Sequence, residues 1–342
     1  MYDANEIGLD WQGNLESLAS VSQAKCSSMD SAGRIKGPTG TALRAIMEID
    51  ETLIDSTMGK LSWGRRVAVN TNIAKDYLVK RPSSQRHSKQ EAIIQWLCHK
   101  SLFDVGLAAH CPNVIDIFIR NKEIWFSMEP IYKAPVLENY LKNIPTWRLK
   151  SKANGILLLK IICQVACCCL VLNSRIGFNH RDLKPDNLLI KTDDVKPHTL
   201  VWKEYEILVA PSPTVVLVDF GFACLGPGKV PWIQAGDDVL STFDACPRVG
   251  RDIFMLLAFL LWRKDLQESL TDEHLEYMRS SLRLTTERWS QINELRANPI
   301  EWIYTLITER GFQCPALDPL AWLQTCSARY PEVVSIRSHS AS

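Results

Sequence analysis

The sequence lacks an excess of charge of either sign, because its 39 Lys and Arg residues are balanced by 38 Asp and Glu residues. A dedicated nucleic-acid-binding protein usually carries a clear basic excess. Apolar residues make up 46% of the 342 positions and charged residues 23%, close to the average of globular proteins. We therefore expect a folded chain that is large enough for two cores and that does not bind nucleic acid.

The N-terminus lacks the apolar stretch of a secretory signal peptide, since MYDANEIGLDWQGN is acidic and polar. The most apolar segment, from Gly155 to Leu172, contains Lys160 and Gln164. It is slightly short for a membrane span and fits a buried helix better. We expect a soluble, intracellular protein without a membrane contact.

The cysteines lack the spacing of a zinc site, because no C-x-x-C pair is joined to a second such pair or to spaced histidines. Their number, eleven, is odd, which argues against a disulfide framework in a chain of this size. Four of them lie in the apolar segment, at positions 163, 167, 168 and 169. They are typical of small buried hydrophobic residues on a helix in a reducing compartment.

Strand-like runs dominate the first 129 residues. Strands are predicted at residues 44–50, 66–69, 76–79, 114–118 and 124–128. Residues 51–63 are predicted to form an irregular connection. One amphipathic helix is predicted to begin at the capping residues Ser83 and Ser84, with apolar residues at positions 92, 93, 96 and 97.

Helical patterns dominate after residue 130. A long apolar helix is predicted at residues 147–172, short strands at 187–190 and 215–218, and further helices from Asp252 onwards. This order indicates an α+β chain with two parts joined near residue 130. We expect a partly ordered leader at 1–30, a β-rich part at 31–129, a helical part at 130–335 and a flexible tail at 336–342.

Two motifs carry most of the chemical information. The run HRDLKPDN occupies residues 180–187, and DFG occupies residues 219–221. These motifs resemble the catalytic loop and the start of the activation segment of eukaryotic protein kinases, in the correct order. The resemblance implies a bilobal protein-kinase-like fold, with a small β-rich N-lobe and a larger helical C-lobe. It also implies a kinase of the serine/threonine type.

The resemblance assigns a role to four residues of these motifs. Phosphoryl transfer depends on positioning and on charge neutralisation. Asp182 would accept or orient the proton of the substrate hydroxyl, and Lys184 would place a positive charge beside the transferring phosphate. Asn187 and Asp219 would supply the hard oxygen ligands that Mg²⁺ prefers. The implied cofactors are ATP and Mg²⁺, and the implied partners are proteins that carry Ser or Thr hydroxyls.

The phosphate-binding residues are assigned by the same resemblance. The run GPTG at residues 37–40 can be aligned with the glycine-rich loop, so Gly37 and Gly40 would approach the phosphates and Ala45 would follow on the next strand. A turn that binds no ligand explains this run equally well. Lys80 ends an apolar strand and would hold the phosphates, paired with Glu91 eleven residues later.

Lys75 is the alternative phosphate lysine, and its separation of 16 residues from Glu91 is more usual for the family. Lys75 lies in a polar run, however, and this favours Lys80. The alternative for Lys80 is a solvated surface lysine that binds no ligand. At the other end of the nucleotide, residues 124–131 resemble the strand and hinge that hold adenine. Met128 would close the back of the cavity, while Glu129 and Ile131 would bind the adenine edge.

The sequence also departs from the family. FDACPR at residues 243–248 stands where the family has A-P-E, and Gln95 stands where the family buries an apolar side chain. The run Gly250-Arg251-Asp252 resembles the start of the helix whose aspartate braces the catalytic loop. Together with EAIIQ at residues 91–95, these features are most similar to the divergent kinases encoded by large DNA viruses.

Two other functions stay open. A pseudokinase that binds nucleotide or partners without turnover fits the irregular glycine run, Gln95 and the absent A-P-E, although the catalytic residues are all present. A small-molecule kinase of related fold usually lacks the intact H-R-D-L-K-P run. The physiological substrate, the activation mechanism and the oligomeric state are not predicted.

Overall fold

The structure is a computed structural model of the 342-residue chain. It describes residues 26–37, 43–54, 60–68, 74–82, 88–226, 233–236, 246–285, 287, 290 and 317–338. Residues 1–25 of the predicted leader, residues 339–342 of the predicted tail and the predicted helix caps Ser83 and Ser84 lie outside these ranges.

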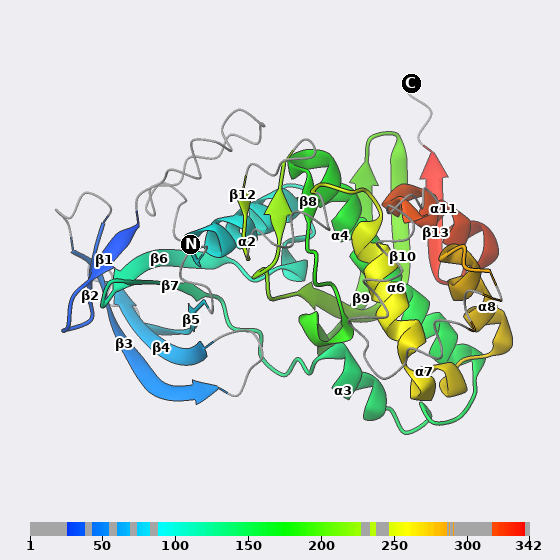
Figure 1. The fold of residues 1–342 in the computed structure, drawn as a ribbon, viewed down its shortest axis with the longest axis horizontal. Coiled ribbons are helices and arrows are strands. Elements are labelled where there is room, and N and C mark those ends of the chain that lie inside the picture. The colour runs from blue at the N-terminus through cyan, green and yellow to red at the C-terminus, as the bar shows by residue number, and fades with distance from the viewer. Residues whose placement is uncertain are drawn as a thin grey trace.

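Seven strands of the N-terminal part close into a barrel in the order β1-β2-β3-β4-β5-β7-β6. Their bounds are β1 Ser27–Met29, β2 Arg34–Lys36, β3 Leu43–Ile54, β4 Lys60–Ala68, β5 Ala74–Arg81, β6 Val114–Arg120 and β7 Glu123–Met128. Parallel pairing of β1 with β6, with Ser27 opposite Phe118, closes the barrel, whereas the other neighbours pair antiparallel. The barrel occupies one end of the molecule (Figure 1).

The predicted bilobal protein-kinase-like fold, with a separate β-sheet as the N-lobe, is therefore wrong. The strands form a closed seven-stranded barrel in a chain of mixed helix and strand content. Closure depends on β1, a strand of three residues that is too short to show an alternating pattern. The irregular connection predicted at 51–63 is also corrected, because β3 continues to Ile54 and β4 begins at Lys60. A register shift between Ile49 and Leu53 interrupts the alternation there.

Apolar side chains fill the barrel, chief among them Ile35, Met47, Val79 and Phe118, which are at most 2% exposed. Each such burial stabilises the fold by about 1.5–3 kcal/mol. Gly64 on β4 makes room for them, since a Cβ at this position would lie 2.6 Å from Val79 Cγ2. The interior of the barrel is thus a packed core.

Several helices pack on a long central helix, α4, Lys152–Ile176 (Figure 1). The other helices in the described part of the chain are α2 Ser88–Phe103, α3 Leu137–Lys142, α6 Arg251–Trp262, α7 Lys264–Ser269, α8 Asp272–Ser281 and α11 Pro319–Arg329. Ser151 caps the first turn of α4 by accepting a hydrogen bond from the Asn154 N–H. The helix ends at Gly177, whose φ of 58° is left-handed.

The apolar composition of α4 is explained by its place in the core. Among the described residues it is the one helix long and apolar enough to cross a membrane, but 83% of its most apolar window is buried inside the protein. Its four cysteines at 163, 167, 168 and 169 are buried and free, as predicted. Burial raises the pKa of the Cys167 thiol to about 12, so it remains a neutral thiol.

Two small sheets complete the helical part. One has the order β13-β10-β9, with β9 Leu188–Trp202, β10 Tyr205–Leu217 and β13 Val334–Ser338. The other has the order β12-β11-β8, with β8 Phe178–Asn179, β11 Cys224–Leu225 and β12 Ile233–Gln234. The short strands predicted at 187–190 and 215–218 correspond to the start of β9 and the end of β10, which pair with each other.

One pair of cysteines is not free. A disulfide joins Cys224 on β11 to Cys246, which precedes α6, and both residues are buried. The expectation from the odd number of cysteines is corrected here, because an odd total does not prevent one pair from forming. The Cα atoms of the pair are 6.3 Å apart, within the normal range for a disulfide.

Candidate functional site

Lys80 lies at the centre of a buried ion-pair network. The register of β5 places it opposite Leu61 on β4 and Phe126 on β7, near the C-terminal end of the strand. Its Nζ is 2.5 Å from Glu91 Oε1 on α2 and 3.1 Å from Asp219 Oδ1. Lys75, the alternative, instead places its amine 5.5 Å from the centre of the Tyr77 ring. The structure thus brings together Lys80, Glu91 and Asp219, and leaves Lys75 outside.

The electrostatics of this network favour a charged lysine. Burial lowers the pKa of the Lys80 amine, but the negative charges of Glu91 and Asp219 outweigh this effect and the pKa is raised. Only 3% of Lys80 is exposed, so its positive charge is poorly screened by water. The site therefore holds a charged lysine between two carboxylates.

A second group of polar side chains surrounds Asp182, which follows β8. Lys184 Nζ lies 2.9 Å from Asp182 Oδ2, and Asn187 Nδ2 donates to the same oxygen at 3.0 Å. Asn187 also donates to the Asp182 carbonyl at 2.7 Å. The short helix η3, Pro185–Asn187, sets this spacing, because it turns the chain so that Asn187 faces back towards Asp182. The carboxylate of Asp182 is thereby fixed in one orientation.

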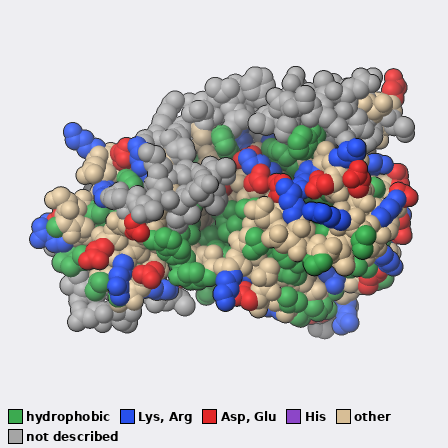
Figure 2. Space-filling view, turned by 90° about the horizontal axis from the view of Figure 1, so that it is seen from below, with side chains coloured by type: hydrophobic (Ala, Val, Ile, Leu, Met, Phe, Trp, Pro, Cys, Tyr) green, Lys and Arg blue, Asp and Glu red, His purple; other side chains and the backbone are tan. Residues whose placement is uncertain are grey.

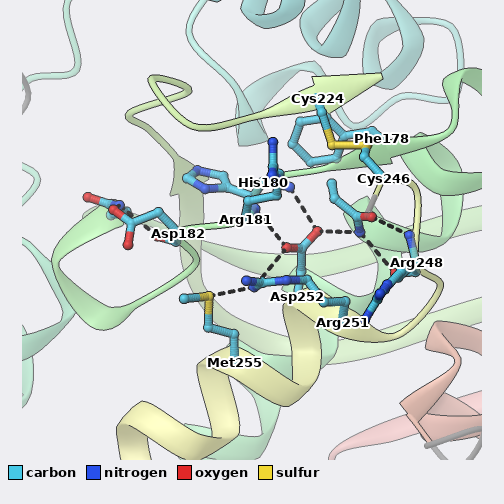
Figure 3. Close-up of polar contacts among 12 residues, drawn as sticks. Phe178, His180, Arg181, Asp182, Cys224, Cys246, Arg248, Arg251, Asp252 and Met255 are labelled. Carbon is cyan, nitrogen blue, oxygen red and sulfur yellow. Dashed lines mark hydrogen bonds and ion pairs between the residues drawn. A yellow bond between two sulfur atoms is a disulfide. The ribbon is translucent and has the colours of Figure 1, made fainter. Parts of the chain in front are cut away.

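Asp252, at the start of α6, braces this loop from below (Figure 3). Its two carboxylate oxygens accept hydrogen bonds from the backbone N–H groups of His180, at 2.9 Å, and Arg181, at 3.0 Å. Asn179 Nδ2 donates to the same carboxylate at 3.1 Å. Asp252 is 2% exposed, so these bonds are shielded from water. The predicted bracing contact is therefore present in the structure.

The backbone is strained where these groups meet. Asp219 has a φ of 63° and Arg181 a φ of 66°, a left-handed conformation that is uncommon for residues other than glycine. Such conformations cost roughly 1–3 kcal/mol each and cluster at functional sites. The imidazole of His180 contacts the Val218 carbonyl at 2.9 Å and packs against Phe220, which links the loop to the residues around Asp219.

A narrow cavity opens beside Lys80 and Asp219. Met128, Glu129 and Ile131 line it, as the resemblance implies. Its volume is about 40 Å³, so any ligand larger than a few water molecules must widen it. Apolar side chains gather where the barrel meets the helical part (Figure 2). The cavity therefore joins an apolar end to a charged end.

Four apolar residues of the cavity wall were not identified from the sequence. They are Leu61, Leu78, Leu189 and Val218. Each comes from or adjoins a different strand, and nothing in the local sequence distinguishes Leu78 and Leu189 from ordinary buried residues. The positions opposite Lys80 and before Asp219 could have indicated Leu61 and Val218.

Neither Gly37 nor Ala45 lines this cavity. Gly37 directly follows β2, Ala45 lies within β3, and Gly40 lies outside the described residues. Ala45 is opposite residue 68 of β4, whereas Lys80 is opposite residue 61. Seven residues of extended strand span roughly 23 Å. The register instead brings the end of β3, at Ile54, opposite Leu61, which is the β4 partner of Lys80.

Neither a scan against models of known protein families nor a search of curated proteins finds a match for this chain. Its function is therefore inferred from the cavity, the lysine network and the loop around Asp182.

Proposed function

We propose that this protein transfers the γ-phosphate of ATP to Ser or Thr hydroxyls of other proteins in a Mg²⁺-dependent reaction. The observation that supports this most is the buried contact of Lys80 with both Glu91 and Asp219, in a cavity that Asp219 also lines. A lysine in this position can hold phosphate oxygens, while the apolar end of the cavity suits a base.

The oxygen donors fit a hard cation. Asn187 Oδ1 is buried and has no hydrogen-bond partner among the described residues. The Asn187 carbonyl accepts from the Val218 N–H at 3.1 Å, which places Asn187 beside the residue that precedes Asp219. The described residues contain no group of three or more His, Cys, Asp or Glu side chains that could hold a metal ion by themselves. Mg²⁺ commonly binds through one or two protein oxygens plus substrate phosphates, so the metal would enter with the nucleotide.

The residues around the cavity have separate roles in this proposal. When bound, the nucleotide would supply the phosphoryl group and the metal would neutralise part of its charge. Lys80 orients the phosphates, with Glu91 holding the lysine in place. Asp182 accepts the proton of the attacking hydroxyl. Lys184 and Asn187 donate hydrogen bonds to its Oδ2 and so hold the carboxylate in place, and neither of these two side chains can itself accept a proton. Lys184 then stabilises the negative charge on the transferred group.

The test measures transfer of labelled phosphate from Mg-ATP to a generic acidic or basic protein. Asp182→Asn removes the proton acceptor and keeps the shape, so the rate should fall about 100-fold or more. In a second assay Mg-ATP should raise the melting temperature, and Asp219→Ala should remove the Mg²⁺-dependent part of that shift.

The two assays separate the alternatives. A shift of the melting temperature without phosphate transfer would favour a nucleotide-binding scaffold that does not turn over. The narrow cavity is the observation that supports this alternative. Absence of both the shift and the transfer would reject the proposal.

A further inference from the structure

One polar side chain in the cavity wall has no role in the chemistry proposed above. Gln95 lies on α2 one turn after Glu91, and it is 3% exposed. Its neighbours in the wall include the apolar side chains of Leu61, Leu78 and Met128. Burial of an amide among such neighbours costs free energy unless the amide is hydrogen-bonded. The partners of Gln95 therefore define what this position does.

The amide nitrogen of Gln95 has two such partners. Nε2 donates to the Pro112 carbonyl at 3.1 Å and to the Met128 thioether sulfur at 3.4 Å. Pro112 lies two residues before β6 and supplies a fixed backbone acceptor. Because this acceptor fixes the amide, the second hydrogen of the NH₂ group is aimed at Met128. Gln95 thus connects α2 to the last residue of β7.

The position of the Met128 side chain determines how much of the cavity is open. Methionine has an unbranched side chain with three rotatable bonds, so it readily adopts several rotamers. Met128 is 8% exposed and lines a cavity of only about 40 Å³. Any rotamer that points into the cavity would fill most of that volume. A bond that keeps the thioether against α2 therefore keeps the cavity open.

We propose that Gln95 is a positioning residue for the base end of the nucleotide, which acts by holding Met128 against the cavity wall. This inference rests on the proposed function, because it concerns the same cavity. The apparent affinity of a ligand falls in proportion to the fraction of molecules whose cavity is open. Loss of the Gln95 amide therefore weakens binding of the base without changing the chemical step.

The test uses Gln95→Met, which keeps the length of the side chain and removes the donor. Dissociation constants for adenosine and for Mg-ATP are measured by calorimetry, together with kcat and KM for ATP. Both dissociation constants and KM should rise by the same factor, about three- to tenfold, while kcat stays unchanged. Lys80→Met, in contrast, should weaken Mg-ATP and leave adenosine unaffected, since adenosine has no phosphates.

A matched control separates positioning from stability. Gln164 on α4 is 1% exposed and donates to Ser212 Oγ at 2.9 Å and to the Pro213 carbonyl at 3.0 Å, outside the cavity wall. Gln164→Met should lower the melting temperature and leave the adenosine affinity unchanged. Equal loss of adenosine affinity in both variants would overturn the proposal.

A double-mutant cycle tests whether Gln95 acts through Met128. Leucine at position 128 has no sulfur to accept the hydrogen bond, so Gln95→Met should have less than about a twofold effect on adenosine binding in the Met128→Leu background. The same three- to tenfold loss in that background would overturn the proposal. If the unaltered protein binds neither adenosine nor Mg-ATP, the proposed function and this inference fail together.

The unaltered protein supplies a test that needs no Gln95 variant. With ¹³C-methyl-labelled methionine, the Met128 signal is assigned by its loss in Met128→Leu. Its carbon shift should be that of a single rotamer both before and after adenosine is added. A rotamer-averaged shift in the free protein would show that Gln95 does not hold Met128, and would overturn the inference.

Discussion

At the scale of single residues, Lys80 is held between two carboxylates on different elements. Replacing Lys80 with Met removes the positive charge from a cavity with little water, so we expect phosphate transfer to fall about 100-fold or more. Lys75→Met is the matched control on the same strand, five residues earlier, and it should leave the rate nearly unchanged because Lys75 contacts only the Tyr77 ring in the described structure. Single-turnover kinetics measure both, and the reverse result would place the phosphate lysine at position 75.

His110 makes the stability of the protein depend on pH. Burial, followed by the nearby charge of His198, lowers the pKa of His110 from 6.5 to about 4, and its Nδ1 lies 2.7 Å from the Val215 carbonyl. In the unfolded chain the pKa returns to its ordinary value. The contribution of His110 to the free energy of unfolding is thus fully present above pH 6.5. It is lost as the pH falls towards 4, and the total loss is about 3 kcal/mol.

The measurement is urea unfolding between pH 7 and pH 4.5. Burial lowers the pKa of His198 as well, which adds to the loss in the same direction. His110→Asn does not titrate, so its free energy of unfolding should vary less with pH than that of the unaltered protein. Parallel pH profiles for the two proteins would contradict this prediction.

Several residues of the candidate site could be predicted from the sequence because their motifs are short and continuous. Asp182, Lys184 and Asn187 lie within eight residues, and Asp219 follows a buried strand. Gly37 does not line the cavity, and a Gly-Pro-Thr-Gly run has the same composition whether or not it faces a ligand. The contact of Gln95 with Met128 joins residues 33 positions apart, and no local pattern indicates it.

At the scale of elements, the disulfide between Cys224 and Cys246 fixes β11 to the segment that leads into α6. The two residues are 22 positions apart, and closing a loop of this length stabilises a protein by about 3 kcal/mol in the chain-entropy account. Cys224→Ser with Cys246→Ser should therefore lower the free energy of unfolding by about that amount.

Chemical denaturation with and without a reductant measures this effect. The reductant should destabilise the unaltered protein and leave the double variant unchanged. Cys98→Ser, at a buried free cysteine, is the control that should keep its response to the reductant. If the reductant leaves the free energy of unfolding of the unaltered protein unchanged, the prediction is contradicted.

Strand lengths in the helical part could not be predicted for a specific reason. β9 and β10 extend far beyond the predicted 187–190 and 215–218, and their added segments contain Pro197, Pro211 and Pro213. Proline and aspartate are disfavoured in strands because they disturb the ladder of hydrogen bonds. Pairing with β13, on the other side of β10, stabilises the outer part of this hairpin, and that pairing is a long-range contact.

At the scale of the whole molecule, closure of the barrel depends on the backbone of β1. Ser28 is exposed, but it pairs with Lys36 on β2 and Ile119 on β6. Ser28→Pro removes an N–H from this ladder and should lower the free energy of unfolding by roughly 2–3 kcal/mol. Ser31→Pro is the control, because Ser31 lies in the turn between Asp30 and Gly33, where proline is tolerated. Equal stability of the two variants, measured by thermal unfolding, would contradict a closing role for β1.

The same parallel pairing imposes an order on the synthesis of the chain. Ser27 contacts Asp116, which is made 89 residues later, so the barrel cannot close until β6 has left the ribosome. The free edge of β10 becomes paired even later, because its partner β13 is among the last described residues to be made. Until then β10 presents unpaired N–H and C=O groups, which attract wrong partners. The edge of β10 therefore stays unpaired after every strand of the barrel has been made.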